Sequence, residues 1–106
     1  MSMFNPPHPG TLIAEYLEDY GVTLRSLAHD LNVSPSALSK AAAGKTAISP
    51  EMALKLEAGL GIAARLWLAM QASYDLSRAR KTIDLSKVIP SPYAQSEPSP
   101  EAKRPQ

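Results

Sequence analysis

The chain has 106 residues, a formal net charge of +1, 44% hydrophobic residues and no cysteine. This size and composition predict one globular domain, exclude disulfides and thiolate metal sites, and leave no apolar run of the roughly 18 residues that a membrane span needs. The N-terminal stretch MSMFNPPHPG has no charged segment followed by an apolar one. We therefore expect no signal peptide, no membrane association and a cytoplasmic protein.

Charge is distributed unevenly along the chain. Residues 1–30 have a net charge of −3, whereas residues 31–50 carry Lys40 and Lys45 and no acidic residue. Residues 51–80 and residues 81–106 each contribute +1. The acid-free stretch is the part of the chain that we assign to a surface facing phosphates.

The first predicted helix covers residues 9–20 and follows an irregular lead-in over residues 1–8. Pro9 suits a first helical turn, and Gly21 is a typical helix stop. Apolar residues recur at helical spacing at Leu12, Ile13, Tyr16, Leu17 and Tyr20. Glu15, Glu18 and Asp19 fall on the other side, where we interpret them as a solvated face; the alternative is contact with a basic protein.

Two short helices separated by a tight turn are predicted next, over residues 24–31 and 35–43. Thr23 and Ser34 are N-cap residues, and Pro35 suits the first position of the second helix. Gly44 ends that helix. The residues expected to face inward are Leu24, Leu27, Ala28 and Leu31 in the first helix, and Leu38, Ala41 and Ala42 in the second.

Residues 23–44 therefore fit a helix-turn-helix, in which the first helix lies across the DNA backbone and the second enters the major groove. Serine hydroxyls suit phosphates or base edges, Lys40 suits a guanine edge or a phosphate, and the residues after the second helix suit the DNA backbone. The predicted DNA-binding residues are Thr23, Ser34, Pro35, Ser36, Ala37, Ser39, Lys40, Lys45 and Thr46.

The chemistry of this outer face is modest. It holds no Arg, Asn or Gln for bidentate base reading, so we expect few strong base contacts and some specificity from DNA shape. From helix spacing alone, a helical domain that binds no DNA fits equally well.

Two further helices are predicted over residues 50–60 and 63–80. The fourth begins with the N-cap Ser49 and buries Met52, Ala53, Leu56 and Leu60. The fifth carries apolar residues around much of its circumference, which indicates burial against more than its own domain. We predict a dimer interface on it, made of Trp67, Leu68, Ala72 and Leu76. Core packing is the alternative for Trp67, as it is for Tyr74.

Residues 1–80 are thus predicted to form one domain for DNA binding and dimerisation, and residues 81–106 a C-terminal extension. Residues 82–85 alternate in polarity and suit a short extended segment. From residue 90 the chain holds five of its ten prolines and almost no aliphatic residue, which predicts a disordered tail.

No catalytic or metal site can be assembled from the sequence. His8 and His29 are the only histidines, and no ligand cluster accompanies them at metal-binding spacing. No nucleophile, base and orienting group stand together in the pattern. We expect neither an enzyme nor a cofactor, with His8 capping or packing and His29 solvated beside Asp30.

Three segments between residues 8 and 80 carry a family resemblance: HPGTLIAEYLEDYGVTLRSLAHDLNVSPSALSK, GKTAISPEMALKLEAGLG and LWLAMQASYDLSRAR. They resemble HigA-type antitoxins of the lambda-repressor-like or XRE helix-turn-helix group. The resemblance implies an all-α, five-helix fold and a homodimer that binds a palindromic operator in double-stranded DNA and represses transcription. It also implies neutralisation of a HigB-type toxin, a RelE-like ribonuclease that cuts messenger RNA at the ribosome.

The chain departs from the family at several positions. Pro35 and Ser36 stand where polar or basic base-reading residues are frequent, Ala43 where Asn is common, and Leu66 where Phe is frequent; residues 62–65 lack the usual Ser/Thr-Pro-Glu helix start. Two alternative functions stay open. One is a stand-alone transcriptional regulator without a toxin, and the other is a protein-interaction module that has lost DNA binding.

Overall fold

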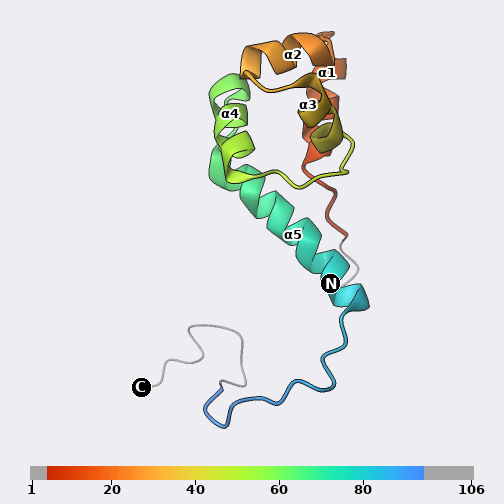
Figure 1. The fold of residues 1–106 in the computed structure, drawn as a ribbon, viewed down its shortest axis with the longest axis vertical. Coiled ribbons are helices and arrows are strands. Elements are labelled where there is room, and N and C mark those ends of the chain that lie inside the picture. The colour runs from red at the N-terminus through yellow and green to blue at the C-terminus, as the bar shows by residue number, and fades with distance from the viewer. Residues whose placement is uncertain (1–4, 95–106) are drawn as a thin grey trace.

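The computed structural model describes residues 5–94, which form five helices and no strand (Figure 1). The helices are α1 (Gly10–Tyr20), α2 (Leu24–Leu31), α3 (Pro35–Ala42), α4 (Pro50–Leu60) and α5 (Ala64–Thr82). The all-α, five-helix prediction is confirmed. Helix α5 ends two residues later than predicted, so Thr82 is helical and extended backbone begins at Ile83.

The helices begin and end at residues whose local chemistry explains the boundary. The Ser49 hydroxyl accepts a hydrogen bond from the Met52 N–H at 3.1 Å, which caps α4 one residue before Pro50. Gly21 and Gly61 adopt left-handed conformations after α1 and α4. A left-handed residue at this position lets the chain leave the helix while its N–H bonds back to the last turn.

The first four helices pack around one core, and α5 runs from it toward the C-terminal extension (Figure 1). Trp67, at the start of α5, is fully buried, and its Nε1 donates to the Ile62 carbonyl at 3.1 Å. The other buried apolar residues are Ile13, Leu27, Ala28, Leu31, Leu38, Ala41, Ile48, Ala53 and Leu56. This core fixes α5 against the helix-turn-helix and leaves Trp67 no surface for a partner.

The N-terminal end of the described chain lies near the outer half of α5, and the C-terminal extension leads away from this helix (Figure 1). The lead-in passes beside this helix, and the Lys81 ammonium donates to the Asn5 amide oxygen at 2.9 Å. After α5, residues 83–94 are exposed and include five large apolar side chains: Ile83, Leu85, Val88, Ile89 and Tyr93. The predicted disordered tail lies, from residue 95 on, outside the described residues. Between residues 5 and 94 no helix combines the length and hydropathy of a membrane span.

Helix α1 approaches the end of α3 at a glycine. A side-chain carbon at Gly10 would collide with the Ala41 carbonyl oxygen and would lie 3.0 Å from that of Ala42. These atoms belong to the backbone and cannot rotate away. Glycine at this position therefore sets the distance between the two helices.

Replacing Gly10 with alanine should lower the free energy of unfolding by about 2–3 kcal/mol, because α1 has to move off α3. Urea denaturation followed by circular dichroism measures the change. Glu15→Ala, at an exposed site on the same helix, is the control and should change stability by less than about 0.5 kcal/mol. Equal stability of Gly10→Ala and the wild type would contradict the close approach.

Candidate nucleic-acid interface

Helix α2 is closed at both ends by short-range hydrogen bonds. The Thr23 hydroxyl accepts from the Ser26 N–H at 3.1 Å. At the other end, Asn32 adopts a left-handed conformation with φ of 57°, and the Val33 N–H donates to the Ala28 carbonyl at 3.0 Å. Asparagine tolerates this conformation better than most side chains. The turn between the two helices is therefore fixed by its own sequence.

Helix α3 starts from the predicted cap. The Ser34 hydroxyl oxygen accepts from the Ala37 N–H at 3.0 Å, and Pro35 occupies the first helical position. Pro35 has no N–H, and the N–H of Ala37 is bonded to Ser34. In this first turn the N–H of Ser36 is therefore left without a hydrogen-bond acceptor among residues 5–94. The first turn of α3 therefore offers one free amide to an anion. The capping hydroxyl still keeps its own hydrogen to donate.

The two helices pack through small and apolar side chains. Leu27, Ala28 and Leu38 are buried between them, and Ala28 is completely inaccessible. Its small side chain allows a close approach. The opposite face of α3 is open, and the predicted DNA-binding side chains along it are all exposed: Ser34, Pro35, Ser36, Ala37, Ser39 and Lys40.

The segment after α3 turns sharply at Gly44, which has φ of 77°. The Lys45 N–H donates to the Lys40 carbonyl at 2.9 Å, so this turn is bonded directly to the last turn of α3. Lys45 and Thr46 are exposed, whereas Ile48 is buried in the core. The structure thus joins the backbone of Lys45 to that of Lys40, and the exposed Thr46 follows directly.

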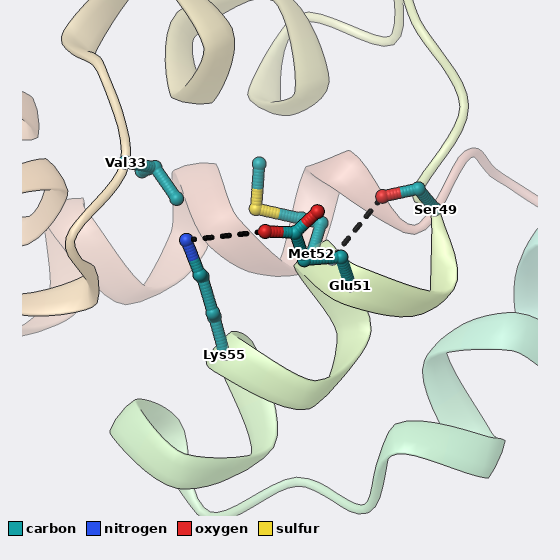
Figure 2. A pocket seen from close by; sticks show the side chains of 5 residues that line it. All are labelled: Val33, Ser49, Glu51, Met52 and Lys55. Carbon is teal, nitrogen blue, oxygen red and sulfur yellow. Dashed lines mark hydrogen bonds and ion pairs between the residues drawn. The ribbon is translucent and has the colours of Figure 1, made fainter.

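Lys55 on α4, which the sequence did not indicate as a functional residue, is bonded to the turn between α2 and α3. The Lys55 ammonium donates to the Asn32 carbonyl at 2.9 Å. It also lies 3.6 Å from the Glu51 carboxylate (Figure 2). Lys55 and Glu51, with Val33, Ser49 and Met52, line a hollow of about 180 Å³. That volume suits a few water molecules and is below the roughly 300 Å³ of a typical small-molecule site. We therefore assign Lys55 to the support of the turn.

His8 has the capping and packing role that the sequence predicts. Its Nδ1 accepts a hydrogen bond from the Gly10 N–H at 2.9 Å, and its ring meets Tyr74 edge to face at 4.9 Å between centroids. His29 is exposed and lies 3.6 Å from Asp30. Within the described part of the chain, no three His, Cys, Asp or Glu side chains gather as a metal site would require.

The four residues predicted for a dimer interface are placed differently from one another. Trp67 is fully buried in its own chain. Leu68 is half-buried against the core, and Ala72 and Leu76 are exposed, with 53% of Leu76 accessible. The surface available on α5 is therefore narrower than the sequence pattern indicates.

Residues 13–67 match the HTH_3 model, described as helix-turn-helix. This range contains all of α2, α3 and α4. The chain is 40% identical over 88 residues to the HTH-type transcriptional regulator YddM of Escherichia coli K12; the match covers 83% of this chain and 94% of that protein.

Solved structures with the same architecture include antitoxins. A plasmid-maintenance antidote protein from Nostoc punctiforme superposes with a TM-score of 0.71 at 33% identity, covering 74% of this chain and 86% of the other. An addiction-module antidote of the HigA family from Coxiella burnetii gives 0.70 at 29%, covering 74% and 86%. Antitoxin HigA of Pseudomonas aeruginosa, solved with the higBA promoter, gives 0.68 at 28%, covering 72% and 84%.

Proposed function

Because the chain belongs to the HTH_3 helix-turn-helix family, we propose that it is the antitoxin of a type II toxin–antitoxin module. In this proposal it binds its own palindromic operator as a homodimer, represses transcription and neutralises a HigB/RelE-like toxin. The observation that carries the proposal is the outer face of α3, which is exposed, contains Lys40 and no acidic residue, and continues into the exposed Lys45. The promoter complex of Pseudomonas aeruginosa HigA supports it.

Two sets of contacts follow from the geometry. Thr23, Lys45 and Thr46 flank α3 and suit phosphates, because they lie beside the helix and not along its outer face. Ser36, Ser39 and Lys40 project from that face and suit base edges in the major groove. Ala37 between them can contact a thymine methyl group. Phosphate contacts then supply most of the affinity, and few base contacts supply sequence preference.

Reversing both lysines of this surface tests the DNA interface. Lys40→Glu with Lys45→Glu should weaken binding by about 100-fold or more, because two attractive phosphate or base contacts become repulsive. Fluorescence anisotropy with a duplex from the region upstream of the chain's own gene measures the affinity. Lys103→Glu with Arg104→Glu gives the same charge change in the C-terminal segment, outside both the helix-turn-helix and the apolar surface of α5, and should bind DNA far more tightly than the Lys40, Lys45 pair. Equal loss in both pairs would contradict this assignment.

The exposed apolar residues at the end of the molecule support the homodimer. Leu66 and Leu76 on α5 are 48% and 53% accessible, and the apolar side chains of residues 83–93 are more so. Beside α5 lies an apolar hollow of 370 Å³ lined by the lead-in and by Leu12, Leu66 and Met70. A second copy covering this surface would remove the apolar area from water. Two-fold symmetry would then present two copies of α3 to successive major grooves about 34 Å apart.

An aspartate at Leu76 tests this interface. Leu76→Asp should yield a monomer, because dimerisation would bury a carboxylate in an apolar contact, while the fold is kept since the site is half exposed. Sedimentation equilibrium gives the mass, and circular dichroism checks the fold. Leu54→Asp, at a site on α4 that is 59% exposed, is the matched control and should remain dimeric. If the Leu76→Asp variant stayed dimeric, the dimer interface would have to lie on another surface of the chain.

The antitoxin part of the proposal is tested in cells. We expect a gene for a small basic toxin directly upstream of the gene for this chain. Co-expression of the chain should restore the growth of cells that this toxin arrests. The Lys40→Glu, Lys45→Glu variant should also restore growth if the toxin binds outside the DNA face. A chain that binds its promoter but leaves growth arrested, or that has no toxin-like neighbour, would instead be a stand-alone regulator.

A further inference from the structure

The loop after α3 has at each of its ends a buried residue from a distant part of the chain. His8 precedes α1, and Gln71 lies in the middle of α5. Between their contact points stand Lys45 and Thr46, both exposed. We call His8 and Gln71 the loop clamp.

Gln71 holds the far end of the loop. Its amide oxygen accepts a hydrogen bond from the Ile48 N–H at 2.8 Å, and its amide nitrogen donates to the Asp75 carboxylate at 3.0 Å. The side chain is only 6% exposed. A buried polar side chain is stable where its hydrogen bonds are made, so Gln71 fixes both the position and the orientation of the Ile48 backbone.

His8 lies at the near end. Its ring stands beside Gly44, at a distance where a side-chain carbon added to that glycine would be in van der Waals contact with it, 3.5 Å from His8 Cγ. The ring is 7% exposed, and it is held by the Gly10 N–H on one side and by Tyr74 on another. Tyr74, which contacts His8, and Gln71, which bonds Ile48, are one turn apart on α5. Both ends of the loop are therefore positioned relative to the same helix.

We propose that His8 and Gln71 are positioning residues for DNA binding, which hold residues 44–48 so that Lys45 and Thr46 meet the DNA backbone at a fixed place beside α3. The inference rests on the proposed function. A loop ordered before binding loses less conformational entropy when it contacts DNA. Neither residue of the clamp touches DNA in this scheme, and each acts through the loop backbone.

The test uses Gln71→Met, which keeps the side-chain volume but removes the acceptor for Ile48. Affinity for the duplex from the upstream region is measured by anisotropy over a range of salt concentrations. The slope of log affinity against log salt should become smaller by about 0.9, the amount expected for one lost phosphate contact. Lys45→Ala should have the same effect in the wild type, and should add little to Gln71→Met, because one contact cannot be lost twice.

Rescue variants separate positioning from simple loss of stability. Gln71→Glu with Asp75→Asn restores an acceptor for Ile48 and reverses the second hydrogen bond, so it should recover the wild-type slope. His8→Asn retains an acceptor for the Gly10 N–H and should keep more affinity than His8→Ala. Thermal unfolding confirms that each variant is folded at the binding temperature.

Separate results overturn the clamp and the proposed function. If the wild type binds DNA and folded Gln71→Met keeps its slope, or if Lys45→Ala lowers the slope equally in both backgrounds, the clamp has no role in DNA binding. If Gln71→Met does not fold, the double variant Gln71→Glu, Asp75→Asn is the deciding test. A folded double variant whose salt-dependence slope equals that of Lys45→Ala would overturn the clamp. A wild-type chain that binds no duplex at low salt would overturn the DNA-binding proposal and the inference with it.

Discussion

The close approach of Gly10 to the carbonyl oxygens of Ala41 and Ala42 is the constraint on which the placement of α3 and of the loop after it depends. It places the N-terminus of α1 against the C-terminus of α3, where the partial charges of the two helix ends attract. The same contact brings His8 beside Gly44 and so sets the start of the loop that carries Lys45. A larger residue at position 10 would displace the end of α3, which is the element that the rest of the interface surrounds.

The parts of the fold that the sequence predicts well are those fixed by nearby residues. Ser34 and Ser49 cap their helices through residues three positions ahead, so the starts of α3 and α4 are readable from Ser-Pro pairs. The hydrogen bonds between Ile48 and Gln71 and between Asn32 and Lys55 each join residues 23 positions apart. No local pattern indicates such a pair. A partial signal exists for Gln71, which interrupts the apolar face between Trp67 and Tyr74.

The fifth helix illustrates the limit of periodicity. An apolar residue on a helix can face the chain's own core or a partner, and spacing alone does not separate these roles. Trp67 and Leu76 have the same apolar character in the sequence, yet one is fully buried and the other is 53% exposed. Tertiary packing at the start of α5 decides the difference, because only that half of the helix lies against the four-helix core. The apolar surface that α5 leaves exposed therefore includes Leu66 on its inner half and Leu76 on its outer half.

The scaffold of the helix-turn-helix is more strongly specified than its chemistry. Capping, close packing at Ala28 and the hydrogen bond from the Ile48 N–H to Gln71 fix where α3 and the following loop stand, while the exposed side chains are mostly small hydroxyls and two lysines. Small hydroxyls have short reach, so the DNA contacts proposed for them would depend on accurate placement of the backbone more than those of long, flexible side chains. Helix α5 carries both Gln71 and the exposed apolar residues Ala72 and Leu76, so an assembly that shifts this helix would also shift the loop at Ile48. The proposed dimer surface and the loop beside α3 therefore depend on the same helix.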